Sequence, residues 1–242
     1  MSCKVALIGG TGMESLWERA GDRLEVSTNY GSVMGKRLIL ESGNHAIVFL
    51  RHGIEHKVPP AKVSYRAFGS ACRDMGIQYC LATGAVGSLR ADWGVGEMLV
   101  PNDFIDFTKR ASVYEDEVLH TDFSDPFDGT CRKALLESCV ELGCSVRDGG
   151  VYVGMPGPRY ETPAEVVALR KLGGDVVGMT ITSEAIAMKE CGVRYACLVL
   201  VTNLAAGLGK KLTHEEVEAR MLENGSLVIS ILMRAAERLC GE

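Results

Sequence analysis

The chain has 242 residues, the usual size of one globular domain that buries its own hydrophobic core. Hydrophobic residues make up 47% and charged residues 24% of it, which excludes a disordered chain. The net charge is −5 and basic residues never run beyond two in succession, so the pattern of a nucleic-acid or membrane-surface binder is missing. We therefore expect a single domain over residues 1–242 that binds a small molecule.

The nine cysteines indicate reduced thiols rather than disulfides. Their number is odd, their spacing is irregular, and Cys80 and Cys197 lie in apolar runs where a thiol packs as a small hydrophobic group. No C-x-x-C pair occurs and the five histidines show no ligand spacing, so no metal is expected. The N-terminal apolar run is too short for a signal peptide. These features predict a cytoplasmic protein.

Short β-rich apolar runs alternate with amphipathic stretches, which is the α/β pattern. The predicted strands cover residues 5–8, 45–50, 79–83, 98–100, 150–153 and 195–202. Helices are predicted over residues 61–75 and 130–142, and each stops at a glycine. Two further helices begin at TPAE and THEE, whose threonine and glutamate have the spacing of a capping box.

The first predicted strand runs into the glycine-rich turn GGTGMES. Amides at Gly9, Gly10 and Gly12, together with the Thr11 hydroxyl, form a nest suited to an oxyanion. The third glycine of a dinucleotide fingerprint falls on Ser15, so a simple anion is favoured over a nicotinamide cofactor. A tight turn without a ligand also fits this segment.

Two more strand ends carry groups suited to an anion. Arg51 and His52 follow VFL, and a guanidinium beside an imidazole suits a phosphate, although a salt bridge to a nearby carboxylate would also explain the arginine. The strand in YCLATGAVGSLR ends on Thr83, Gly84 and Ala85, small residues that leave amides exposed. Because ligands of α/β sheets gather at carboxyl strand ends, we expect these ends to meet.

Later segments carry groups suited to a heterocycle. Tyr160 can stack on a ring and Glu161 can hydrogen-bond to it, although an ordinary surface loop has the same composition. Asn203 ends the apolar strand CLVLVT, where an amide has no packing role. Met179 and Thr180 precede a helix and would equally serve as core and cap.

Two histidines complete the candidates. His214 lies in the first turn of the last predicted helix, where the helix dipole disfavours the imidazolium, so a neutral side chain is expected. His120 lies in the polar segment VLHTDFSDPF, where solvent exposure is the simple explanation.

Taken together, these segments resemble the trimeric purine nucleoside phosphorylase and methylthioadenosine phosphorylase family. The likeness runs through GGTG, RHGIEHKVPPAKVSYRA, TGAVGSLR, FIDFTKR, GPRYETPAEVVALRKLGGDVVGMT, SEAIAMKECGVRYA and VTNLA in that order. It implies a central mixed sheet, partly closed into a barrel and surrounded by helices, in a homotrimer whose interfaces complete each site. Ser183 departs from the family's usual proline, and Ser64 from the asparagine of the methylthioadenosine branch.

Carried over residue by residue, the resemblance divides the candidates among phosphate, base and sugar. The implied phosphate ligands are Thr11, Arg51, His52, the Ala85 backbone and Thr180. The implied base-binding residues are Tyr160, which packs against the purine, and Glu161 and Asn203, which address its edge. Met179 would lie under the ribose. His120 matches a histidine that reaches the neighbouring subunit's 5′ pocket, and His214 matches one that binds a 5′-hydroxyl.

The implied reaction is phosphorolysis of a purine nucleoside, with inorganic phosphate as co-substrate and no organic cofactor. Arg51 and His52 would hold the attacking phosphate, and Asn203 would stabilise the charge on the leaving purine, so these three are the predicted catalytic residues. A 6-oxopurine has a hydrogen on N1 that Glu161 can accept, whereas N1 of a 6-aminopurine is itself an acceptor. The adenine-preferring branch has two aspartates where this chain has Asn203 and Ala205. We therefore predict inosine, guanosine or S-methyl-5′-thioinosine as substrates.

Three alternatives stay open on sequence alone. A methylthioadenosine phosphorylase is favoured by the overall likeness and His120, and opposed by Asn203 and Glu161. A non-catalytic nucleoside-binding protein would have no need of a phosphate cradle. A nicotinamide oxidoreductase built on GGTGMES is the third.

Overall fold

The structure is a computed structural model that describes residues 5–54, 56–110, 112–210 and 213–241, without the side chain of His214. Its strands are β1 Val5–Gly9, β2 Arg23–Thr28, β3 Gly31–Ile39, β4 His45–Leu50, β5 Tyr79–Ser88, β6 Met98–Val100, β7 Asp103–Asp106, β8 Arg147–Asp148, β9 Val151–Gly154, β10 Val176–Gly178 and β11 Arg194–Leu204. Its helices are α1 Glu14–Arg19, α2 Tyr65–Asp74, α3 Gly129–Glu141, α4 Pro163–Lys171, α5 Ile181–Glu190 and α6 His214–Cys240, with a 3₁₀ turn at Pro60–Lys62.

The described strands form one mixed sheet that branches at β5. β5 pairs in parallel with β1 and β11 and antiparallel with β10. The residues of β1 are buried throughout, as expected for a strand covered on both faces. The predicted mixed sheet is therefore confirmed. No pairing among the described strands joins the ends of the sheet at β2, β7 and β8, so the predicted partial barrel is not confirmed.

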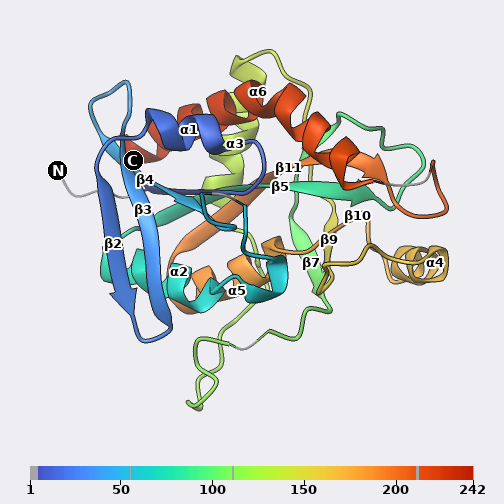
Figure 1. Ribbon diagram of the computed structural model, residues 1–242, viewed down its shortest axis with the longest axis horizontal. Coiled ribbons are helices and arrows are strands. Elements are labelled where there is room, and N and C mark those ends of the chain that lie inside the picture. Colours follow the sequence, from blue (N-terminus) through green and yellow to red (C-terminus); the bar gives the residue numbers. More distant parts are fainter. Residues whose placement is uncertain (1–4, 55, 111, 211–212, 242) are drawn as a thin grey trace.

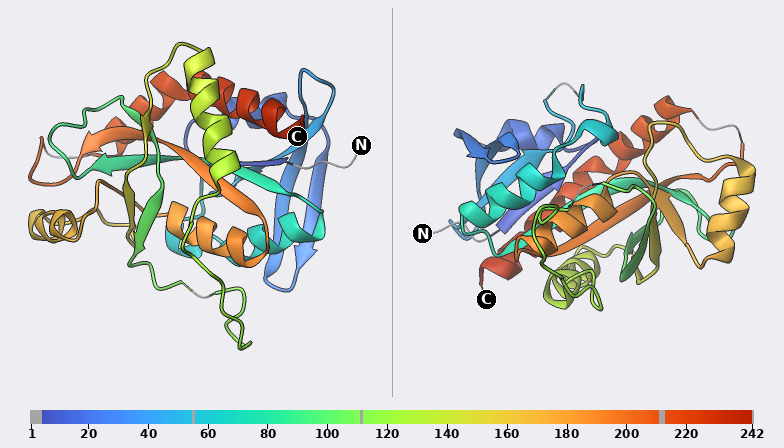
Figure 2. Two further views of the ribbon diagram at one scale, coloured as in Figure 1. Left: turned by 180° about the vertical axis from the view of Figure 1, so that it is seen from behind. Right: turned by 90° about the horizontal axis from the view of Figure 1, so that it is seen from below.

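Helices cover both faces of the sheet, with α1, α3 and α6 on one face and α2 and α5 on the other (Figures 1 and 2). Each pair of layers encloses its own apolar core. Phe68 of α2 and Ile181 of α5 belong to one core, and Leu135 of α3 and Leu232 of α6 belong to the other. Among the described residues, no helix is both long and apolar enough to cross a membrane.

Local chemistry explains where the helices begin. The helix predicted from residue 61 starts only at Tyr65, because the prolines at 59 and 60 favour a short 3₁₀ turn and Ser64 has a non-helical ψ of 73°. α4 begins with the predicted capping box, in which Thr162 and Glu165 hydrogen-bond reciprocally. The early prolines matter for the site, because they leave residues 59 and 60 facing a cavity.

Candidate functional site

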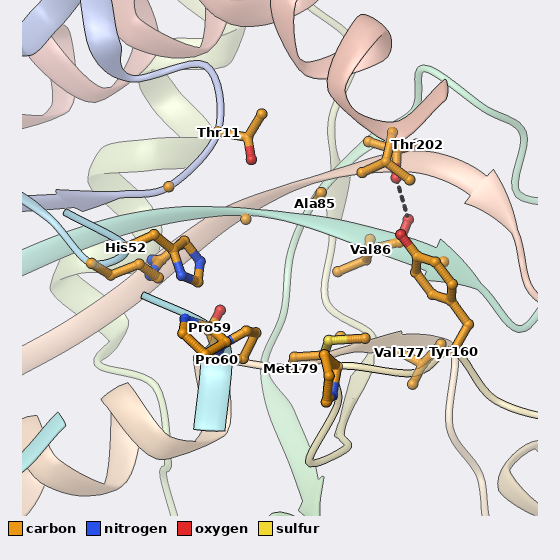
Figure 3. A pocket seen from close by; sticks show the side chains of 18 of the residues that line it. Thr11, His52, Pro59, Pro60, Ala85, Val86, Tyr160, Val177, Met179 and Thr202 are labelled. Atoms are coloured by element: carbon orange, nitrogen blue, oxygen red, sulfur yellow. Dashed lines mark hydrogen bonds between the residues drawn. The ribbon is translucent and has the colours of Figure 1, made fainter. Parts of the chain in front are cut away.

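The carboxyl ends of β1, β4, β10 and β11, together with the second half of β5, enclose a cavity of about 370 Å³. Figure 3 shows Thr11 and His52 toward one side, Tyr160 and Thr202 toward the other, and Ala85 and Met179 between them. Nine of the eleven candidates from the sequence line this cavity: Thr11, Arg51, His52, Ala85, Tyr160, Glu161, Met179, Thr180 and Asn203. Segments far apart in the chain thus meet as expected from their places at strand ends.

The turn after β1 forms one end of the cavity. A Cβ atom on Gly10 would lie 3.0 Å from His52 Cδ2 and 3.4 Å from Arg51 Nη1, so glycine lets the backbone approach both side chains. Gly12 has a φ of +87°, which a glycine adopts without strain. The Thr11 side chain is partly exposed between them and lines the cavity.

Helix α6 closes over the same turn. The Cβ position of Gly12 lies 3.1 Å from Met221 O, and that of Gly225 lies 3.2 Å from Gly12 O. A glycine inside a helix is destabilising relative to alanine, and this close backbone contact accounts for Gly225. Val217 of α6 also lines the cavity.

Arg51 is held by a buried network. Its Nε and Nη2 donate to the two carboxylate oxygens of Glu184 at 2.6 and 3.0 Å, and its Nη1 donates to Thr83 O at 2.7 Å. Tyr195 Oη donates to Glu184 Oε2 at 2.8 Å. Burial by itself lowers the pKa of Arg51, but the charge and hydrogen bonds of Glu184 outweigh it and hold that pKa above its ordinary value. The salt bridge considered for Arg51 therefore exists, and the arginine still lines the cavity.

His52 is oriented by the backbone. Its Nδ1 lies 2.7 Å from Val58 O, and because a carbonyl only accepts, this nitrogen carries the hydrogen. The other nitrogen, Nε2, lies 3.4 Å from the Cβ position of Gly10. The ring of His56 lies 4.6 Å from that of His52, and His56 lines the cavity with a φ of +53° that is uncommon outside glycine.

The opposite end of the cavity carries a carboxylate and an amide. Glu161, on the loop before α4, is partly buried, and this burial raises the pKa of its carboxyl group. The pairing of β5 and β11 shifts register between Val201 and Asn203, an irregularity of the kind that re-aims a side chain. Asn203 Nδ2 donates one of its two hydrogens to Leu204 O at 3.1 Å, and Asn203 Oδ1 accepts from Thr202 at 3.0 Å.

Two walls join these ends. Met179 follows β10, and its Sδ would lie 2.4 Å from a Cβ atom on Gly157, so the thioether packs directly over that glycine. Thr180 is buried at the N-cap of α5, beside the first turn of a helix, where an anion is favoured. Ala85 of β5 lies across the cavity floor.

His120 is exposed and is absent from the lining described for this chain. A single chain does not test its implied role in a neighbouring subunit. The side chain of His214 lies outside the described residues, so its implied role is also untested. Within the described ranges, no group of three or more His, Cys, Asp or Glu side chains is arranged to hold a metal ion.

Sequence reasoning missed the residues that support the site. Glu184 lies within the segment SEAIAMKECGVRYA, where a carboxylate next to Ala185 and Ile186 could have signalled a buried partner. Tyr195 comes just before the apolar run ACLVLV of β11, and its buried hydroxyl likewise signals a partner. His56 was visible in RHGIEHK, but nothing in that segment showed that its ring would turn back toward His52.

Comparisons with known proteins identify the family of this chain. A model of the phosphorylase superfamily matches residues 4–237. The chain is 40% identical over 240 residues to the probable S-methyl-5′-thioinosine phosphorylase of Methanopyrus kandleri, covering 97% of this chain and 92% of that protein. It is 38% identical over 255 residues to the 6-oxopurine nucleoside phosphorylase of Pyrococcus furiosus, covering 98% and 96%.

A solved structure of methylthioadenosine phosphorylase from Schistosoma mansoni in complex with adenine has a TM-score of 0.92 and 27% identity, and covers 99% of this chain and 93% of that one. Sequence and fold therefore agree over almost the full length of the chain. The chain belongs to the phosphorylase superfamily and, within it, to the family of purine nucleoside phosphorylases and methylthioadenosine phosphorylases.

Proposed function

We propose that this protein catalyses the phosphorolysis of 6-oxopurine nucleosides. The observation that carries the proposal is that one cavity holds an arginine and a histidine at one end, Arg51 and His52, and a carboxylate with an amide at the other, Glu161 and Asn203. Its volume of about 370 Å³ lies within the usual range of small-molecule sites. The relatives named as phosphorylases of 6-oxopurine and methylthioinosine nucleosides support the same substrate class.

The cationic end suits inorganic phosphate. Arg51 donates three of its five guanidinium N–H groups to Glu184 and Thr83. Its Nη1 lies close to the Gly10 turn, where an anion would bind. His52 Nε2 would donate to a phosphate oxygen when the ring is protonated. The Thr11 hydroxyl, the Ala85 backbone amide and Thr180 complete the proposed set of phosphate ligands. Such a cradle orients one phosphate oxygen toward C1′ of the sugar.

In the proposed reaction, a phosphate oxygen forms a bond to C1′ while the bond from C1′ to N9 of the purine breaks. The electron pair of the broken bond moves onto the purine, which leaves as the free base after taking a proton from solvent at N7. Sugar 1-phosphate is the second product. The second N–H of Asn203 Nδ2 would donate to N7 or O6 and stabilise this developing charge.

The carboxylate of Glu161 selects the base. It would accept the hydrogen that a 6-oxopurine carries on N1, whereas N1 of a 6-aminopurine has a lone pair that the carboxylate repels. Tyr160, next to it in the cavity lining, would pack on the purine face. Met179 would lie beneath the ribose, beside the same loop.

We also propose the homotrimer and the neighbouring role of His120. Residues 112–122 project from the body of the molecule (Figure 1). The base of this segment is tied down, since Glu190 accepts from Ser112 Oγ and from Val113 N, both at 2.6 Å. Near its tip, Val118 is 95% and Leu119 52% exposed, apolar surface that a second subunit would cover. Light scattering in solution measures the oligomer directly.

The test is release of free base from inosine, guanosine, S-methyl-5′-thioinosine, adenosine and S-methyl-5′-thioadenosine, each with and without phosphate. Phosphate-dependent release of hypoxanthine or guanine is the expected result. Inosine and its methylthio counterpart differ only at the 5′ position, so the ratio of their kcat/KM values identifies the preferred 5′ group. Release that does not depend on phosphate, or no release from any nucleoside, would refute the proposal.

A methylthioadenosine phosphorylase is the second candidate, favoured by the TM-score of 0.92 to the Schistosoma mansoni enzyme. The same panel decides between them. Dominant release of adenine would show that the hydrogen bonds to the purine differ from those proposed for Glu161 and Asn203.

A further inference from the structure

Arg110 lies behind the cavity wall, outside its lining, on the segment that follows β7. Its Nη1 donates to Met179 O at 2.9 Å and to Ser183 Oγ at 2.7 Å. Its Nη2 donates to Pro156 O at 3.2 Å. One guanidinium thereby joins the ends of β9 and β10 to the first turn of α5.

The same cation reaches the other side of the cavity through an aromatic ring. Arg110 Cζ lies 4.9 Å from the ring centroid of Tyr65, within the range of a cation–π contact. Tyr65 is buried at the start of α2, and its hydroxyl donates to Pro60 O at 3.0 Å. Pro60 and Met179 both line the cavity, so Arg110 and Tyr65 connect two of its walls.

The segment that Arg110 fixes leads directly into the base-binding loop. Pro156 precedes Gly157, on which Met179 packs, and the chain continues to Tyr160 and Glu161 in the cavity lining. A shift of the Pro156 carbonyl would therefore move both the thioether and the groups proposed to hold the purine.

Ser183 supplies an acceptor that the usual proline at this position would lack. Its Oγ also lies 3.2 Å from Thr108 Oγ1, which donates to Asp106 Oδ2 at 3.1 Å. Thr182 Oγ1 donates to Asp106 Oδ1 at 2.7 Å. Arg110 thus ends a chain of hydrogen bonds that begins at a carboxylate, and such networks fix the geometry of their members.

We propose that Arg110 is a positioning residue that fixes the sugar wall and the base-binding loop relative to each other. This inference rests on the proposed phosphorolysis of nucleosides. Among the described residues, Arg110 donates to Met179 O, Ser183 Oγ and Pro156 O, and not to Arg51 or His52, which have their own supports. Of the proposed phosphate ligands, only Thr180 is next to one of these contacts. Loss of Arg110 should therefore raise the KM for the nucleoside and leave the KM for phosphate nearly unchanged.

The test compares Arg110→Met and Arg110→Lys with the unchanged protein. In Arg110→Met we expect the KM for inosine to rise about tenfold, with a KM for phosphate within about twofold, because displaced contacts of this kind lose rate and affinity steeply. The KM of Arg110→Lys for inosine should lie between those of the unchanged protein and Arg110→Met, since an ammonium keeps the charge but not the planar fork. Arg73→Met is the matched control, because Arg73 is exposed on α2 and pairs with its neighbour Asp74. An equal rise in both KM values, or no change in either, would overturn the inference.

A second readout separates this inference from the proposed function. Hydrogen exchange without substrate should be faster in Arg110→Met over residues 155–162 and unchanged over residues 5–12. If the unchanged protein cleaves no nucleoside, the proposed function fails while this measurement still stands. Unchanged protection over residues 155–162 would overturn the role of Arg110.

Discussion

The two ends of the cavity are built in different ways. At the cationic end, Arg51 is 3% exposed and its partner Glu184 is fully buried among strands and helices. At the other end, Tyr160 and Glu161 are partly exposed on a loop. Phosphate is the same co-substrate for every nucleoside, so its proposed ligands can be fixed in the core. The base varies between nucleosides, and the proposed contacts of Tyr160 and Glu161 with it come from a loop, where specificity usually resides.

The comparison predicts that the buried end controls stability and the exposed end controls selectivity. Glu184→Gln tests this first, because it leaves the charge of Arg51 buried without its counter-ion. We expect the free energy of unfolding to fall by about 4 kcal/mol and the KM for phosphate to rise. Urea unfolding measures the first change and phosphate titration the second.

Glu223→Gln is the matched control, since Glu223 pairs with Arg220 on the exposed face of α6. It should change the free energy of unfolding by less than about 1 kcal/mol. Equal losses of unfolding free energy in the two variants would show that the buried ion pair contributes no more to stability than an exposed one.

Asn203→Asp tests the opposite end. Replacing the donor by a carboxylate should lower kcat/KM for inosine about a hundredfold, because the leaving 6-oxopurine loses its hydrogen bond. The ratio of kcat/KM for adenosine to that for inosine should therefore rise. The unfolding midpoint should change little. Asn224→Asp, an amide on α6 that donates to Arg220 O, controls for the added charge. Unchanged selectivity would remove Asn203 from the base-binding set.

Glu161→Gln sharpens the comparison through pH. Burial raises the pKa of Glu161, so in the unchanged protein the carboxylate that accepts from N1 is lost at a higher pH than for an exposed glutamate. In the unchanged protein we expect kcat/KM for inosine to fall as the pH drops through this raised pKa. At neutral pH, kcat/KM of Glu161→Gln for inosine should be about tenfold lower than that of the unchanged protein. Every other titrating group is common to both proteins, so the ratio of the two pH profiles isolates Glu161. A ratio that does not vary with pH would contradict the assignment.

Gly10→Ala has the smallest expected effect and returns to the cationic end. The added Cβ would lie 3.0 Å from His52 Cδ2, so the imidazole has to shift by a few tenths of an ångström. The KM for phosphate should rise about fivefold while the KM for inosine stays constant, since small displacements at a preorganised site reduce rate and affinity. Gly129→Ala, where no atom lies within 4 Å of the new Cβ, is the control. A change confined to the inosine KM would place the anion elsewhere.

The sequence predicts the strand ends of this site better than their supports. Thr11, Arg51 and Asn203 follow apolar runs, and the rule that strand ends converge was enough to place them in one cavity. Glu184 holds Arg51 across 133 positions, and Arg110 donates to Pro156, Met179 and Ser183 across 46, 69 and 73 positions, which no local pattern encodes. The 3₁₀ turn at Pro60–Lys62 was missed because the helical pattern continues through it. The relation of His120 to a neighbouring subunit depends on a second chain.

The contact between the Gly12 turn and α6 has a consequence for how the protein is made. The turn lies far ahead of His214–Cys240 in the chain, so it is synthesised well before the helix that closes over it. A nascent chain emerging from the ribosome can pair β1 with β4 and β5 and still leave this turn uncovered. The proposed phosphate cradle would therefore be completed only after α6 is released, and a product stalled before α6 would lack both this closure and the part of the apolar core that α6 supplies.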